Sequence, residues 1–183
     1  MDDSPFKKNA KYSDLERIPD GWVGEIIDGD LYAFPRPSTQ HGRALGRLFK
    51  QVDDEEDDNP SGWIILQEPA IRFGKNVLVP DIAGWRRTRM KQLPHVPRID
   101  LVPDWVCEGL SPSTARIDKG RKRELYAHHK VGHLWYVDAE SQLIEVLALD
   151  GKSYLLIKTG GGKARIALPP FAQRINLAKL WKR

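Results

Sequence analysis

The sequence has a single cysteine, no long apolar run and no internal repeat. With Cys107 alone, an internal disulfide is excluded and a cysteine-rich zinc site has no support. No apolar stretch approaches the roughly 18 residues of a membrane-spanning helix, and the first residues contain no hydrophobic segment of the signal-peptide type. We therefore expect a soluble, cytoplasmic protein with no membrane partner.

The chain is long enough for one sizeable core and rather short for two. It has 183 residues, of which 40% are hydrophobic. We expect an N-terminal arm over residues 1–20 and a single domain over residues 21–183.

Charge of one sign does not dominate, since the net charge is only +4, but the cations are clustered. Residues 86–98, RRTRMKQLPHVPR, contain five Lys or Arg and no acid, and residues 116–123, RIDKGRKR, contain five beside one acid. This bias fits binding of a polyanion without establishing it. The acidic run at residues 53–58 indicates a solvated turn, with a weak cation site as the less favoured alternative.

Alternating helical and strand patterns predict a mixed α/β fold. Asp28-Gly29 lies between two apolar runs, as in a two-residue β-hairpin, and residues 38–50 place leucines at helical spacing after a Ser/Thr cap. The remaining expected elements are strands at 63–73, 76–85 and 104–111, a helix at 116–129 capped by Ser113 or Thr114, a C-terminal β-meander and a short final helix. The order predicts a twisted mixed sheet flanked by helices.

Two carboxylates interrupt apolar strands. Glu108 follows Trp105-Val106-Cys107, and Asp81 lies between Val79-Pro80 and Ile82. Because an unpaired buried carboxylate costs several kcal/mol, each needs a partner. On adjacent strands, both acids could bind one hard cation such as Mg²⁺. Alternatively, Asp81 forms a turn after Pro80 and Glu108 pairs with a nearby arginine.

Four ordered motifs resemble the Uma-two-type restriction-endonuclease family, a branch of the PD-(D/E)xK nuclease superfamily. They are GEIIDGDLYAFPRPSTQHGRAL, VPDIAGW, WVCEGLSPST and DKGRKRELYAHHKVGHLWYVDAE, and the resemblance extends from about Trp22 to the last helix. It implies a restriction-endonuclease-like mixed sheet flanked by helices, an acidic metal site and cleavage of a DNA phosphodiester.

The superfamily places a lysine two residues after the glutamate, where this chain has Leu110. In the family that the chain resembles, the lysine comes from the following helix, and the matching residue is Lys122, with Lys119 as the substitute. The alternative for Lys122 is a surface ion pair with Asp118, four residues earlier. Gly109 stands where the family often has a β-branched residue.

These matches give each residue an expected role. Asp81, Glu108 and the carbonyl of Gly109 would bind Mg²⁺, with Mn²⁺ as a substitute, and Lys122 would orient the attacking water or neutralise the phosphate. Glu25 matches a family acid at the pocket edge, unless it faces solvent on the hairpin. His41 would contact a phosphate, although it could also be a capping or surface group. Contacts with flanking phosphates are also expected from Arg86, Arg87, Arg89, Arg121 and Arg123. The alternative for these arginines is a solvated basic surface.

We therefore expect a metal-dependent DNA endonuclease, acting as a homodimer if it cuts both strands. The alternative is a catalytically silent nucleic-acid-binding or scaffold protein with the same fold. A sugar- or protein-binding module would leave the two strand acids and the basic helix unexplained.

Overall fold

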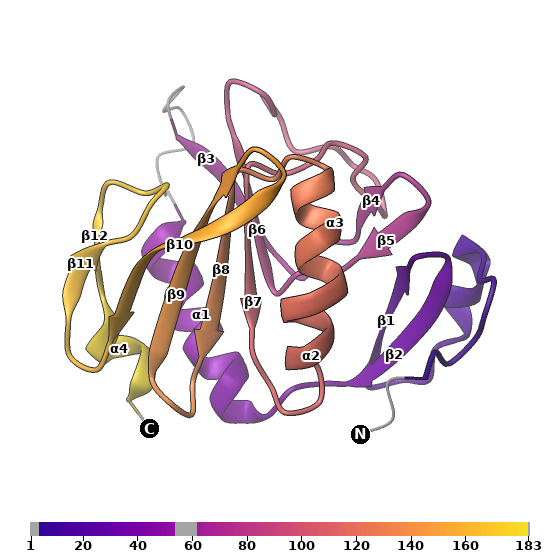
Figure 1. Cartoon of the computed structure of the whole chain (residues 1–183), viewed down its shortest axis with the longest axis horizontal. Coiled ribbons are helices and arrows are strands. Elements are labelled where there is room, and N and C mark those ends of the chain that lie inside the picture. Colours follow the sequence, from indigo (N-terminus) through magenta and orange to yellow (C-terminus); the bar gives the residue numbers. More distant parts are fainter. Residues whose placement is uncertain (1–3, 54–61, 183) are drawn as a thin grey trace.

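A six-stranded mixed sheet forms the centre of the protein (Figure 1). The structure is a computed structural model that describes residues 4–53 and 62–182; most of the acidic run at 53–58 therefore lies outside the described residues. The strand order is β10-β9-β8-β7-β6-β3, and only β7 and β8 run parallel. The expected mixed sheet flanked by helices is confirmed.

The chain forms these elements in order: η1 (Tyr12–Arg17), β1 (Trp22–Ile27), β2 (Asp30–Pro35), α1 (Thr39–Val52), β3 (Trp63–Gln67), β4 (Ile71–Phe73), β5 (Asn76–Leu78), β6 (Ile82–Arg86), β7 (Trp105–Gly109), α2 (Ala115–Ile117), η2 (Asp118–Lys122), α3 (Arg123–His128), β8 (His133–Asp138), β9 (Leu143–Asp150), β10 (Ser153–Gly161), β11 (Arg165–Ala167), β12 (Arg174–Asn176) and α4 (Leu177–Trp181).

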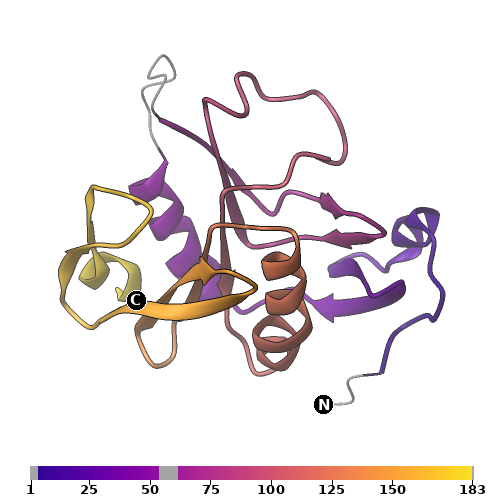
Figure 2. The same cartoon turned by 45° about the horizontal axis from the view of Figure 1, so that its top comes forward.

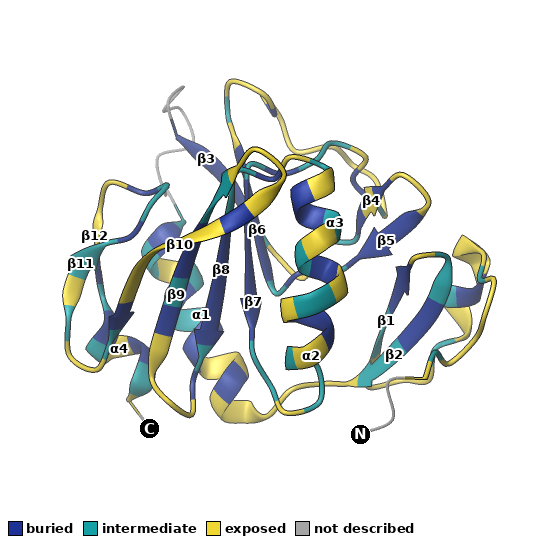
Figure 3. Ribbon diagram, in the orientation of Figure 1, coloured by how far each residue is buried: buried dark blue, intermediate teal, exposed yellow. Residues whose placement is uncertain are grey.

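Helices cover both faces of the central sheet (Figures 1 and 2). On one face, α1, α4 and the β11–β12 hairpin enclose a core that includes Trp105, Cys107 and Trp135. On the other face, α3 packs over Val106, Tyr136 and their neighbours. The central strands are therefore buried on both sides, as Figure 3 shows by their dark blue colour.

The predicted hairpin and first helix are confirmed. Asp28 and Gly29 both have positive φ, at 55° and 86°, which is the backbone geometry of a tight two-residue turn. The Ser38 hydroxyl caps α1 by accepting from the backbone N–H of His41. The segment before the hairpin packs against it through Leu15 and Ile18.

Two predicted strands are wrong in extent, because each divides into two. Residues 63–73 give β3 and β4, and residues 76–85 give β5 and β6; β4 and β5 join β1 and β2 in a second sheet of order β2-β1-β5-β4. The breaks fall at Pro69 and Pro80, which have no N–H to continue a ladder. The second sheet brings the hairpin beside the start of β6.

The helix after β7 is confirmed in place, and of its two predicted caps Thr114 is the N-cap residue. Thr114 occupies the N-cap position without a side-chain cap bond. Its hydroxyl lies 3.0 Å from that of Ser111, which also lies 2.9 Å from that of Ser113. The helix then widens into a π-turn over Asp118–Lys122 before continuing as α3.

Candidate active site

The two acids lie at the same end of the central sheet, but only Glu108 is within a strand. The prediction that Asp81 lies inside an apolar strand is wrong: Asp81 is in a bend after Pro80, directly before β6. Because Ile82 of β6 is opposite Cys107 of antiparallel β7, this bend is next to Glu108. The Asp81 Oδ2 atom also accepts from the backbone N–H of Gly109 at 2.7 Å. Both acids line one pocket of about 60 Å³, room for a few water molecules.

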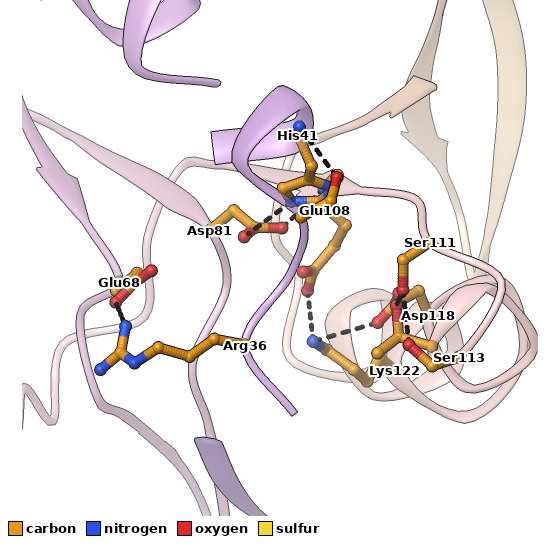
Figure 4. Close-up of polar contacts among 12 residues, drawn as sticks. Arg36, His41, Glu68, Asp81, Glu108, Ser111, Ser113, Asp118 and Lys122 are labelled. Carbon is orange, nitrogen blue, oxygen red and sulfur yellow. Dashed lines mark hydrogen bonds and ion pairs between the residues drawn. The ribbon is translucent and has the colours of Figure 1, made fainter. Parts of the chain in front are cut away.

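The buried partner of Glu108 is a lysine rather than an arginine. The Lys122 Nζ atom lies 2.8 Å from Glu108 Oε1, 3.1 Å from Glu25 Oε1 and 3.2 Å from Asp118 Oδ1 (Figure 4 draws the pairs with Glu108 and Asp118). The side chains of Lys122 and Glu108 are only 4% and 3% exposed. The arginine partner and the surface-pair alternative are therefore both wrong, although the contact with Asp118 exists.

The substitute lysine points elsewhere. Lys119 Nζ lies 2.5 Å from Glu145 Oε2, and its side chain is 45% exposed. The helix thus presents Lys122, and not Lys119, to the acids.

Burial and charge oppose each other within this cluster. Burial raises the pKa of Glu108 well above its ordinary value, and Lys122 partly offsets that effect. Burial disfavours the charged form of Lys122, but Glu108 and Glu25 outweigh it, so the pKa of Lys122 is raised and its ammonium stays charged. Three buried carboxyl groups surround one ammonium, so the cluster carries a net negative charge when all three are ionised.

Glu25 points into the protein, so its solvent-facing alternative is wrong. It is 3% exposed on β1, and its Oε1 atom accepts from the backbone N–H of Val79 at 2.6 Å. Burial raises the pKa of its carboxyl group, against the effect of Lys122. The second sheet thereby supplies a third carboxylate to the pocket.

His41 approaches Asp81 from the opposite face of the sheet. It is 7% exposed, and its Nε2 atom lies 3.4 Å from Asp81 Oδ1, so the surface-group alternative is wrong. Its imidazole fills the space above Gly109: a Cβ added there would lie 2.3 Å from His41 Cε1 and 2.8 Å from Leu45 Cδ1. Glycine after the glutamate therefore makes room for helix α1.

Sequence reasoning missed Tyr126 and the full part played by Asp118. The Tyr126 hydroxyl donates to Glu108 Oε1 at 2.5 Å. Asp118, Lys122 and Tyr126 are spaced four residues apart, and the π-turn between them keeps all three on the face that covers β7. That spacing in the sequence was the available signal.

The predicted phosphate-contacting arginines divide by position. Arg86, Arg87 and Arg89 lie at or beyond the end of β6, about 17 Å along the strand from Asp81. Arg89 pairs with Asp104 at 2.8 Å. The structure does not bring these three to the acids.

The two arginines of the helix also differ. Arg121 donates to the hydroxyl of Tyr32, which is the β2 neighbour of Glu25. Arg123 donates to the carbonyl of Tyr154 on β10, away from the pocket. Arg121 is thus the one predicted arginine beside an acid of the site.

Residues 9–178 match the family of sequences described as "Putative restriction endonuclease", Uma2. The chain belongs to the Uma2 family. A crystal structure of "a putative nuclease belonging to DUF820" from Anabaena variabilis is similar to this chain over 90% of its length and 92% of the other chain, with a TM-score of 0.71 and 19% identity. Comparison with curated proteins gave no match.

The Uma2 assignment confirms the resemblance of the sequence to that family. Within the described ranges, no helix has the length and apolar character needed to cross a bilayer. The same ranges contain no group of three or more His, Cys, Asp or Glu residues arranged to hold a metal. Any metal here would bind two carboxylates together with backbone or solvent oxygens, which suits Mg²⁺, an ion that usually retains several waters.

Proposed function

We propose that this protein is a Mg²⁺-dependent endonuclease that hydrolyses DNA phosphodiester bonds. The observation that carries the proposal is the convergence of Asp81, directly before β6, and Glu108 of β7 on one pocket, with the buried ammonium of Lys122 from the next helix. The Uma2 family supports a nuclease, and the oxygen donors support a hard divalent cation over a soft one.

Asp81, Glu108 and the backbone carbonyl of Gly109 would hold the ion. The N–H of Gly109 donates to Asp81. Because the N–H and C=O of one strand residue face the same neighbouring strand, the carbonyl of Gly109 also faces the Asp81 side. A bound divalent ion lowers the pKa of a coordinated water and offsets charge on the phosphate. Mn²⁺ has similar ligand preferences and should substitute.

Lys122 would supply the positive charge that faces the phosphate or its attacking water. Glu25 and Asp118 would hold its ammonium in place. The contact with Glu108, a proposed metal ligand, keeps the same ammonium close to the bound ion. His41 and the Gly109 N–H fix the two oxygens of Asp81. Glu25, Asp118 and His41 thus act as positioning groups around the three residues proposed for the chemistry.

Plasmid cleavage tests the proposal. Purified protein is incubated with supercoiled DNA and Mg²⁺ or Mn²⁺, beside Asp81→Ala, Lys122→Ala and the matched control Lys119→Ala, whose lysine is on the same helix but exposed. We expect cleavage by the wild type and the control, and none by the other two. Linear product would fit the expected homodimer, since both strands must be cut.

Cleavage that survives both Asp81→Ala and Lys122→Ala would reject this site. No cleavage by any variant under any metal condition would favour the silent DNA-binding alternative, which would still bind DNA in a gel-shift assay.

A further inference from the structure

The groups proposed for catalysis lie at the bottom of a narrow pocket. Side-chain exposure is 3% for Glu108 and 4% for Lys122, and only Asp81, at 21%, meets solvent appreciably. The pocket is small, at about 60 Å³, so a sugar and its base do not fit beside the acids. A substrate must therefore insert one phosphate while its sugar and base stay at the mouth.

The mouth of this pocket is mainly apolar. Its wall next to the hairpin is formed by a partly buried Phe34 and the exposed Pro35 and Pro37, together with Val23 and Val79. Phe34 is stacked on Tyr32, with ring centroids 6.4 Å apart and planes 8° apart, so its ring is held in a fixed orientation. Flat apolar faces of this kind stack on nucleic-acid bases.

The charges around the mouth do not suit a duplex. Among the described residues that line the pocket, Lys122 at its base is the single Lys or Arg, whereas Glu68 lies at the rim. Glu68 is paired with Arg36 at 3.2 Å, and both side chains are about half exposed, at 49% and 59% (Figure 4). A duplex brings two phosphate backbones and needs several cations, but the basic run that starts at Arg86 lies at the other end of β6. In the basic run at 116–123, Lys119 is paired with Glu145, and Arg121 and Arg123 donate to Tyr32 and Tyr154.

We infer that the strand cut at this site is unpaired around the scissile phosphate, as in single-stranded DNA or an opened segment of a duplex. This inference rests on the proposed nuclease function. One base packs on Phe34, Pro35 and Pro37 while its phosphate enters the pocket, and Arg36 exchanges Glu68 for a neighbouring phosphate. In an intact duplex the bases are stacked inside and cannot reach this surface, whereas an unpaired nucleotide can turn its base outward.

The test compares one end-labelled strand in three forms: alone, in a full duplex, and in a duplex with a central mismatched segment. Initial cleavage rates are measured with Mg²⁺ and with Mn²⁺. We expect the single strand and the mismatched segment to be cut at least about tenfold faster than the full duplex, because one stacked base contributes about that factor. Equal rates on the full duplex would overturn the inference.

A binding measurement is the second part of the test, and it does not require the protein to cleave DNA. Fluorescence anisotropy in Ca²⁺ measures the Kd of the same labelled strand, single and paired. Tighter binding of the single strand supports the inference, and tighter binding of the duplex contradicts it. Absence of cleavage on every form would count against the proposed nuclease function, whereas the relative Kd values test the substrate form separately.

Variants of the wall locate the effect. Phe34→Ala should weaken single-strand binding about tenfold, and Phe6→Ala, the same change at an exposed phenylalanine outside the pocket, should leave it unchanged. Because Phe34 also packs against the core, a thermal melt must show that the variant is folded. Arg36→Ala removes only an exposed side chain and should weaken binding several-fold. Wild-type single-strand affinity in both folded variants would refute the inference.

Discussion

Replacing Lys122 by methionine should destabilise the protein strongly. Methionine has a similar length but leaves Glu25, Glu108 and Asp118 without the ammonium that now lies 2.8 to 3.2 Å from each. Breaking a buried ion pair by removing one partner costs about 3–5 kcal/mol, since an uncompensated charge is left inside. For a chain of this length each kcal/mol corresponds to about 2–4 °C in Tm. We therefore expect Tm to fall by about 10 °C.

The matched control is Lys119→Met, one turn earlier on the same helix. Its partner Glu145 is 28% exposed and Lys119 itself 45%, so that pair contributes less than about 1 kcal/mol. Differential scanning calorimetry of both variants gives the comparison. Equal losses in the two variants, or a loss below about 1 kcal/mol for Lys122→Met, would refute the buried-cluster account.

The loss in Lys122→Met should also depend on pH. Without the ammonium, the pKa values of Glu25 and Glu108 rise further, because burial already favours the neutral forms of these two carboxyl groups. A group whose pKa is raised by folding destabilises the protein as pH rises through that pKa. The difference from wild type should shrink as pH is lowered and grow toward neutral pH.

Three further changes probe the surroundings of the acids. Gly109→Ala would place a Cβ 2.3 Å from His41 Cε1, so we expect a loss of about 1–3 kcal/mol in a thermal melt; an unchanged Tm would contradict the packing of His41. Tyr126→Phe removes the hydroxyl that Glu108 accepts at 2.5 Å and should cost about 1.5–3 kcal/mol in urea unfolding, whereas no change would show that this contact is dispensable. Burial raises the pKa of Glu108 and Glu25, and a metal ion binds ionised carboxylates. The Mg²⁺ affinity measured by calorimetry should therefore increase as the pH rises above 4.5, the ordinary pKa of glutamate. An affinity that falls as the pH rises would contradict this assignment.

The acids themselves could be predicted from the sequence because they interrupt apolar runs, although only Glu108 lies within a strand. Asp81 and Glu108 each follow an apolar run, and Glu108 is itself buried, where a lone carboxylate is costly without a partner. The hairpin and α1 could be predicted for a similar reason, since Asp28-Gly29 and Ser38 have local conformational preferences that act before tertiary packing.

What the sequence did not yield depends on contacts between distant segments. The split at Pro69 and Pro80 sends β4 and β5 to the hairpin, which turns Glu25 inward. In the sequence Tyr126 is indistinguishable from an aromatic core residue; its hydroxyl reaches Glu108 only because α3 packs against β7. Gly109 resembles a weakness in a strand until His41 is seen to occupy the space above it.

The most direct test of the central claim is an anomalous-difference map from a crystal soaked in Mn²⁺. The account predicts one peak within about 2.5 Å of carboxylate oxygens from both Asp81 and Glu108, with Lys122 still in the pocket. Absence of a peak between these two acids, or a peak held by other residues, would contradict it.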